Sequence, residues 1–163
     1  MNNPNFKIIF YKDMQLRKAK RGDLRYIVEM LADDDLGSTR EDFRFPVPAS
    51  YMDAFENINL DPNQELMVVE NMKGEIIGTM QLTFIQYLTY QGGIRAQLEA
   101  VRIHKNHRGT GLGTEMIKWA ISKARKKGAH VVQLTTDKKR LDALRFYRDL
   151  GFVDSHEGMK LHL

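Results

Sequence analysis

Apolar residues recur along this chain with two periods, one of two residues and one of about 3.6, which are the periods of strands and helices. Strands are predicted at residues 15–19, 65–70, 75–89, 94–104 and 130–135, with an added edge strand at 6–11 and a final strand pair within 152–163. Helices are predicted at 24–32, where Asp23 caps the first turn, around Tyr51–Phe55, and at 111–127 and 141–150. The pattern predicts a mixed α/β fold with helices on both faces of a sheet.

The turn between the strand at 94–104 and the helix at 111–127 is basic and contains three alternate glycines, Gly109, Gly111 and Gly113. Glycines let backbone amides approach a ligand closely. The first turn of a helix also offers unpaired N–H groups and the positive end of its dipole. Such a turn suits a phosphate or pyrophosphate, and Arg108 at its edge is expected to add charge-assisted bonds.

Three anion-binding motifs compete for this turn. A P-loop requires a lysine after its last glycine, and Thr114 follows Gly113 instead. A dinucleotide fingerprint requires Gly-x-Gly-x-x-Gly after a first strand, but here the third glycine comes one place early and the turn lies late in the chain. The third motif, Arg/Gln-x-x-Gly-x-Gly/Ala, fits residues 108–113. The alternative without a ligand is a solvated, glycine-rich turn that caps the helix.

A second motif lies about 30 residues downstream. Residues 143–152 read Ala-Leu-Arg-Phe-Tyr-Arg-Asp-Leu-Gly-Phe, an amphipathic helix with Leu141, Leu144 and Leu150 as candidate core residues and Gly151 at its C-cap. This segment resembles the Ala-x-x-Phe-Tyr-x-x-x-Gly-Phe signature of the GCN5-related N-acetyltransferases (GNAT superfamily). The glycine turn resembles the pyrophosphate-binding turn of the same family, and the joint match covers about residues 65–163.

The resemblance implies the GNAT fold: a mixed, mostly antiparallel twisted sheet of about seven strands, with helices on both faces and a splayed central strand pair. One domain is expected over residues 1–163. Residues 1–13 precede an internal methionine, Met14, and form a candidate N-terminal extension to that domain.

Composition narrows the function classes. With no cysteine, the chain has no thiolate metal site and no cysteine nucleophile, and its five histidines lack metal-ligand spacing, so no metal is expected. The net charge of +4 fits an anionic cofactor but is too small to indicate nucleic acid. No apolar run approaches the length of a membrane span and no signal-peptide pattern is present, so no membrane partner and a cytoplasmic location are expected.

Acetyl-CoA, as the acetyl-donor cosubstrate, is the cofactor that the resemblance implies. The expected contacts are Val101, Arg102 and Ile103 for the pantetheine arm and Arg108, Gly109, Thr110, Gly111, Leu112, Gly113 and Thr114 for the pyrophosphate. Arg140 replaces an asparagine that bonds the cofactor in many relatives, and an arginine there could still meet a phosphate. Asp142 either caps the helix or orients a cofactor group.

Two catalytic residues are predicted. Glu99 lies two residues before Val101, hence on the same side of the strand by period two, and its spacing to the arginine turn resembles that of a strand glutamate in some family members. It is the candidate base, and an exposed glutamate paired with Arg95 or Arg102 is the alternative. Tyr147 is the candidate acid, by resemblance to relatives with a tyrosine facing the thioester sulfur, and a cleft-wall residue is the alternative.

The expected function is an N-acetyltransferase that moves an acetyl group to a primary amine of a small molecule or peptide by direct attack in a ternary complex. The runner-up is an acyl-CoA-binding regulatory module without turnover. The acidic residues at 33–35 and 41–42, with Phe43, Phe45 and Tyr51, either attract a cationic amine or form a solvated loop. Many family members are homodimers, and residues 152–163 are the candidate contact.

Overall fold

The computed structural model describes residues 8–33 and 35–163. The strands are β1 (Ile8–Tyr11), β2 (Met14–Lys18), β3 (Gln64–Glu70), β4 (Ile76–Gln86), β5 (Ile94–Ile103) and β6 (Ala129–Leu134). The helices are α1 (Leu24–Ala32), α2 (Asp35–Ser38), α3 (Ala49–Leu60), α4 (Thr89–Gly92), α5 (Leu112–Lys126) and α6 (Leu141–Asp149), with 3-10 turns η1 (Arg21–Asp23) and η2 (Lys105–His107). The start of the edge strand predicted at 6–11, and Asp34 of the acidic loop, lie outside the described residues.

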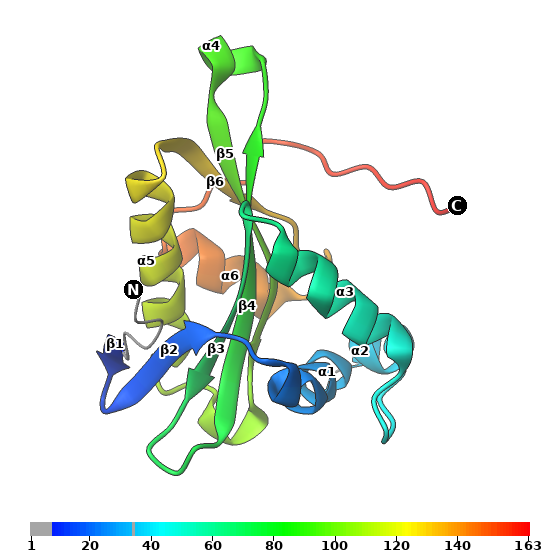
Figure 1. The fold of residues 1–163 in the computed structure, drawn as a ribbon. Helices are drawn as coiled ribbons and strands as arrows, with labels where there is room; N and C mark the ends of the chain where they lie inside the picture. Colours follow the sequence, from blue (N-terminus) through cyan, green and yellow to red (C-terminus); the bar gives the residue numbers. More distant parts are fainter. Residues whose placement is uncertain (1–7, 34) are drawn as a thin grey trace, which may run out of the picture.

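The strands form one sheet in sequence order from β1 to β6 (Figure 1). Neighbours are antiparallel as far as β5, and β6 runs parallel to β5. The predicted mixed, mostly antiparallel sheet is therefore confirmed. Within residues 8–33 and 35–163 it has six strands rather than about seven, because the final strand pair predicted within 152–163 does not form.

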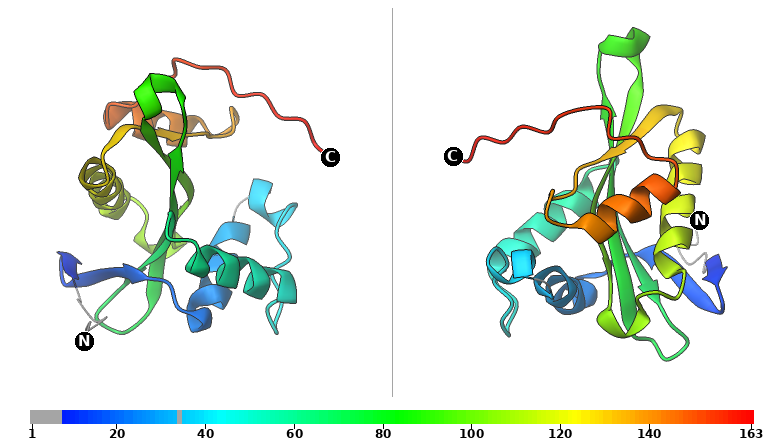
Figure 2. Two further views of the ribbon diagram at one scale, coloured as in Figure 1. Left: turned by 45° about the horizontal axis from the view of Figure 1, so that its top comes forward. Right: turned by 180° about the vertical axis from the view of Figure 1, so that it is seen from behind.

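Phe152 packs at the edge of the α5-side core, and the residues after it run as an extended tail that leaves the body of the protein (Figure 2). The alternating apolar residues that predicted a strand are almost fully exposed, with Met159 at 94% and Leu161 at 86%. The tail touches the body near Gly158, whose Cβ position lies 4.0 Å from Thr135 Cγ2. A strand needs a neighbouring ladder for its backbone groups, and the tail beyond Gly158 has no such neighbour among the residues that the structure describes.

Helices cover both faces of the sheet, as predicted: α1 and α3 lie on one side, and α5 and α6 on the other (Figures 1 and 2). The α5 side holds the larger core, in which the predicted helix positions Met116, Ile117, Ala120 and Ala124 are all at most 1% exposed. Leu150 packs at the edge of this core, but Leu141 is 65% exposed, so its predicted place in the core is wrong. Leu141 is the first residue of α6, at the exposed end of the helix.

Asp23 precedes α1 as predicted, but its carboxylate does not cap that helix. It accepts the Lys20 N–H at 2.7 Å and binds Arg17, whose Nη1 lies 2.6 Å from Asp23 Oδ2. Arg17 also reaches Glu70 of β3. Since the hydrogen bond to Asp23 favours the charged guanidinium, the pKa of Arg17 is raised. Asp23 thus ties the start of α1 to the sheet through Arg17.

A β-bulge in β5 changes which face of the sheet the side chains after Glu99 occupy, compared with the prediction. Glu99 pairs with Gln81 of β4 and Arg102 with Thr79, so β5 has two residues where β4 has one, and Ala100 adopts a positive φ of 52°. Ala96 and Leu98 pack into the α5-side core, and Val101 and Ile103 pack there too. Glu99 and Arg102 therefore lie on the α1–α3 face. The prediction that Glu99 and Val101 share a side is wrong, because alternation with period two does not continue through a bulge.

Candidate functional site

The glycine turn joins β5 to α5 and presents the first turn of that helix (Figure 1). Gly109 and Gly111 have positive φ angles of 73° and 87°, a backbone conformation that side chains disfavour. Gly113 differs: a Cβ there would lie 3.4 Å from Cζ of Phe146 in α6, an ordinary contact distance. The conformation of the turn therefore requires glycine at positions 109 and 111, and the third position would accept a small side chain against α6.

Hydrogen bonds hold the turn from several sides. Thr110 Oγ1 donates to the His107 carbonyl at 2.8 Å, and the Tyr11 hydroxyl donates to the Thr110 carbonyl at 3.3 Å. Arg108 donates through Nε to the Ile103 carbonyl at 3.1 Å and through Nη2 to Asp33 Oδ2 at 2.9 Å. The turn is thus held in place just before α5, whose first amides have no partner within the helix and suit an anion.

Beside this turn, β5 and β6 separate. Their parallel register runs from Ile94 opposite Ala129 to Leu98 opposite Leu134, and from Glu99 onward β5 pairs only with β4 within the described residues. The predicted splayed strand pair is therefore present. An extended ligand arm could bond the unpaired side of β5 at this gap.

The residues predicted for the pantetheine arm lie along this gap. The Val101 carbonyl accepts from Arg102 Nη1 at 2.8 Å, and the Ile103 carbonyl accepts from Arg108. Leu112 is only 1% exposed, so its side chain belongs to the core and only its backbone faces the turn. Thr114 lies in the first turn of α5.

Tyr147 of α6 lies half-buried at the edge of the α5-side core. Its ring packs edge-to-face on Phe146 and Phe152, with centroids 5.1 Å and 5.6 Å away. Burial raises the pKa of Tyr147, and the positive charges of Arg102 and Arg140 only partly oppose that rise. The hydroxyl therefore stays protonated at neutral pH, near two arginines that were predicted to bind the cofactor.

Glu99 is an exposed residue of β5, and its carboxylate has no hydrogen bond or ion pair with the described residues. The alternative in which it pairs with Arg95 or Arg102 is therefore not seen. Asp142 pairs with Arg145 on the surface of α6. Arg140 precedes the first turn of α6 as its N-cap residue.

The acidic loop is largely paired. Asp33 binds Arg108, Glu41 binds Arg40 at 2.6 Å, and Asp42 binds Arg44 at 3.2 Å. The Tyr51 hydroxyl donates to Glu41 and accepts the Asp42 N–H, and burial is the main cause that raises its pKa. These pairings favour a structural loop over a cluster of acids that attracts a cation.

Sequence reasoning missed Tyr11 and the role of Asp33. Each contacts the glycine turn from a distant part of the chain, across 99 residues for Tyr11 and 75 for Asp33. No local pattern signals either contact. Asp33 and Arg108 carry opposite charges, but so do many other pairs of residues in this chain, so charge alone does not identify this ion pair in the sequence.

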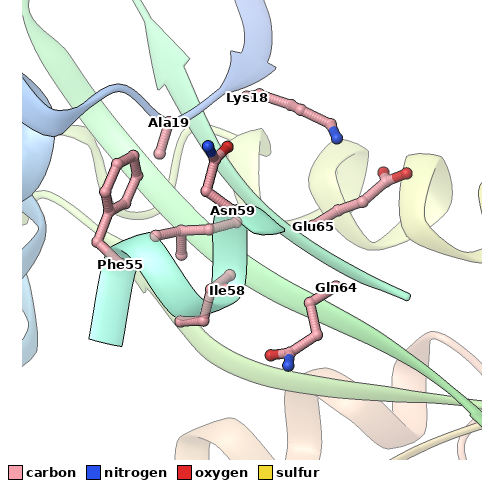
Figure 3. Close-up of a pocket in the computed structure, with 8 residues that line it drawn as sticks. Lys18, Ala19, Phe55, Ile58, Asn59, Gln64 and Glu65 are labelled. Atoms are coloured by element: carbon pink, nitrogen blue, oxygen red, sulfur yellow. The ribbon is translucent and has the colours of Figure 1, made fainter. Parts of the chain in front are cut away.

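A separate hollow lies between α3 and the start of β3, lined by Phe55, Ile58, Asn59 and Gln64 among others (Figure 3). Its acid, Glu65, points toward α5 and pairs with Lys123 at 3.0 Å. Gln64 pairs with Thr83, whereas the glycine turn follows Ile103, opposite Gly78 at the other end of β4. The hollow is thus separate from the gap and the turn.

Within residues 8–33 and 35–163, no group of three or more histidine, aspartate or glutamate side chains is arranged to hold a metal ion. No helix in this part of the chain is both long enough and apolar enough to cross a bilayer.

Comparison with known proteins decides the family. The sequence profile of the Acetyltransferase (GNAT) family matches residues 36–152, which include the gap, the glycine turn and α6. The chain belongs to the GNAT acetyltransferase family. Members of this family transfer acetyl groups from acetyl-CoA.

Three known proteins are similar to this one over about two thirds of the chain or more. The aminoalkylphosphonate N-acetyltransferase of Salmonella typhimurium is 30% identical over 107 residues, which are 66% of this chain and 68% of that protein. A crystal structure described as a transcriptional regulator from Bacillus halodurans C-125 is 52% identical with a TM-score of 0.89, over 92% of this chain and 99% of that one. A Trypanosoma brucei acetyltransferase is 25% identical with a TM-score of 0.75, over 93% and 100%.

Proposed function

We propose that the chain is an acetyl-CoA-dependent N-acetyltransferase that acetylates a primary amine of a small molecule or peptide by direct attack in a ternary complex. The observation that carries this proposal is the gap between β5 and β6, which opens beside the glycine turn and has Tyr147 near the two arginines. The chain has no cysteine, so an acetyl-cysteine intermediate is excluded.

Cofactor binding uses the turn and the gap together. The amides of the turn and of the first turn of α5 bind the diphosphate, with Arg108 adding charge. The Arg108 guanidinium donates to the Ile103 carbonyl at the end of β5 and to Asp33 after α1. One side chain of the turn is therefore bonded to the strand that lines the gap. The backbone of Val101, Arg102 and Ile103 bonds the pantetheine arm, and Arg140 contributes charge from the start of α6.

The reaction requires two proton movements. The amine nitrogen forms a C–N bond with the acetyl carbonyl carbon, the C–S bond breaks, and the sulfur leaves as a thiolate. The amine loses one proton and the thiolate gains one. Tyr147 supplies the second proton, because its raised pKa keeps the phenol protonated across the neutral range.

Glu99 accepts the amine proton, directly or through a water. The bulge at Ala100 puts Glu99 on the α1–α3 face, opposite the face that carries Val101 and α5. An amine that enters from the α1–α3 face would therefore meet Glu99, while the thiol leaves toward α6. This arrangement supports separate entry sides for acceptor and donor.

The test is release of CoA from acetyl-CoA with a panel of amines, amino acids and peptides, starting with aminoalkylphosphonates because the Salmonella relative bears that name. Tyr147→Phe is expected to lower turnover at least about tenfold while acetyl-CoA affinity changes little. Tyr90→Phe, on the exposed tip beyond β4, is the matched control. Unchanged turnover in Tyr147→Phe would remove Tyr147 from the mechanism.

Glu99→Gln tests the base separately. We expect the rate to fall mainly below the pKa of the amine itself, where a base is needed to remove its proton. The pH profile of kcat/KM is measured for both proteins. Identical profiles would reject Glu99 as the base.

The second candidate is an acyl-CoA-binding regulatory module without turnover. It is favoured by one observation: the 52% identical structure from Bacillus halodurans is described as a transcriptional regulator. Both candidates are expected to bind CoA, but only the enzyme is expected to release CoA from acetyl-CoA when an amine is present. CoA binding by calorimetry, together with no CoA release across the whole amine panel, would favour the module.

We also propose a homodimer in which the tail of one copy pairs with the free edge of β6 in the other. Among residues 8–33 and 35–163, β6 has a strand neighbour on one side only, and the tail carries exposed Met159, Leu161 and Leu163 at alternate positions. Light scattering of the full chain is expected to give twice the 18.9 kDa chain mass. A Met159→Lys, Leu161→Lys variant is expected to be monomeric, and a monomeric parent would overturn the proposal.

A further inference from the structure

The N-terminal strand β1 lies against the glycine turn, outside the segment that the family profile covers. Tyr11 ends this strand, and Lys12 and Asp13, with positive φ angles of 43° and 64°, make the two-residue turn into β2. Positive φ at both central positions is typical of a tight hairpin turn. This hairpin turn fixes where the Tyr11 side chain points.

Tyr11 contacts the turn at one peptide group. Its hydroxyl donates to the Thr110 carbonyl at 3.3 Å and lies 3.3 Å from the position a Cβ would take on Gly111. Its ring packs at the edge of the α5-side core, and the Lys12 ammonium lies 5.0 Å from the ring centroid. Tyr11 is therefore held by its own neighbours while it bonds the turn.

The bonded peptide is the one that opens α5. The Thr110 carbonyl and the Gly111 N–H belong to the same planar trans peptide, so they point in opposite directions. Because Tyr11 draws the carbonyl toward β1, the Gly111 N–H points away from β1. Gly111 is the N-cap of α5, and its N–H is one of the groups that the helix itself leaves without an intrahelical partner.

The glycine at position 111 allows the Thr110–Gly111 peptide to leave this orientation by rotation. A Thr-Gly peptide can rotate because glycine populates positive and negative φ almost equally. Rotation would turn the Thr110 carbonyl toward the anion site, where its oxygen would repel a diphosphate. A bond that holds this carbonyl away from the site therefore favours the binding conformation.

We propose that Tyr11 is a positioning residue of the cofactor site, whose hydroxyl fixes the Thr110–Gly111 peptide so that the Gly111 N–H faces the diphosphate. The inference rests on the proposed function of the glycine turn. It assigns to the segment before Met14 a part in cofactor affinity and none in the acetyl-transfer step.

The test compares two acetyl donors in the full chain, with Tyr11→Phe as the variant. Acetyl-CoA carries the diphosphate and S-acetylpantetheine lacks it. We expect Tyr11→Phe to raise KM for acetyl-CoA about threefold, since an O–H···O distance of 3.3 Å is long and the bond correspondingly weak. The kcat at saturating acetyl-CoA and kcat/KM for S-acetylpantetheine are expected to stay unchanged. Tyr90→Phe, which also loses one phenol hydroxyl, is the control and should match the parent with both donors.

Three outcomes would overturn the inference: no change with either donor, an equal loss with both donors, or a loss confined to kcat. A urea unfolding midpoint measured beside the kinetics separates general destabilisation from the expected selective effect. The proposed function fails differently, because a parent chain without affinity for CoA would refute it before any variant is compared.

Discussion

The three glycines of the turn are expected to respond differently to the same substitution by alanine. Gly109 and Gly111 have φ angles of 73° and 87°, and a left-handed conformation costs a residue with a side chain about 1–2 kcal/mol. A gain of about 0.4–1 kcal/mol from the less flexible unfolded chain offsets part of that cost. We expect Gly109→Ala, whose Cβ meets nothing within 4 Å, to lower the free energy of unfolding by about 1 kcal/mol.

Gly111→Ala should cost more than Gly109→Ala, because its Cβ would also lie 3.3 Å from the Tyr11 hydroxyl oxygen. Gly113→Ala should have the opposite sign. Its Cβ would meet Phe146 at 3.4 Å, an ordinary contact distance, and alanine is favoured over glycine in a helix by about 0.5–1 kcal/mol. From the most to the least stable, the expected order is Gly113→Ala, the parent, Gly109→Ala and Gly111→Ala.

Urea unfolding measures this order directly, with the fluorescence of Trp119, the sole tryptophan, as the signal. Trp119 lies in α5, the helix that the turn begins. Calorimetry with CoA gives the second readout: Gly113→Ala should keep its affinity, and the other two variants should lose part of it. A Gly113→Ala protein as unstable as Gly111→Ala would refute the division of roles among the three glycines.

Two further predictions concern stability. Arg17→Met leaves the carboxylates of Asp23 and Glu70 without their shared partner, so the free energy of unfolding should fall by about 2–4 kcal/mol in urea titrations. Arg21→Met breaks only an exposed 3.6 Å pair and should cost less than about 0.5 kcal/mol, and equal losses would contradict the reasoning. The pKa of Tyr147 is raised above its usual 10.0, so the stability it contributes is complete below pH 10 and is lost as the pH rises through the folded-state pKa. Between pH 9 and pH 11 the unfolding midpoint of the parent should therefore fall further than that of Tyr147→Phe, and parallel falls would contradict this.

Elements with a strong local signal were predictable from the sequence. The turn at Asn71–Gly74 is an example, because the Asn71 side chain accepts the Lys73 and Glu75 N–H groups and Gly74 takes a positive φ of 79°. The helix at α5 and the glycine turn before it were predicted for the same reason. All of these depend on residues within a few positions of one another.

Features that depend on distant partners were not predictable. The alternation at Met159, Leu161 and Leu163 is typical of a strand, but a strand also needs a neighbour, and its own sequence does not specify one. Asp23 precedes α1 as a cap would, yet Arg17 and the Lys20 N–H bind its carboxylate instead. The contacts of Tyr11 and Asp33 with the glycine turn belong to the same class.

The bulge at Ala100 offers a rule for aligning related chains. Core residues of β5 are spaced by two up to Leu98 and then by three to Val101, so a single step of three within an alternating strand marks the bulge in sequence. A chain that lacks the inserted position would alternate directly from Leu98 onward, so the residues equivalent to Val101 and Ile103 would still face the apolar layer under α5 and the one equivalent to Arg102 would still face away. A gap of one residue between the equivalents of Leu98 and Val101 therefore needs no exchange of polar and apolar residues, whereas a gap placed after Val101 would turn the equivalent of Ile103 outward and is misplaced.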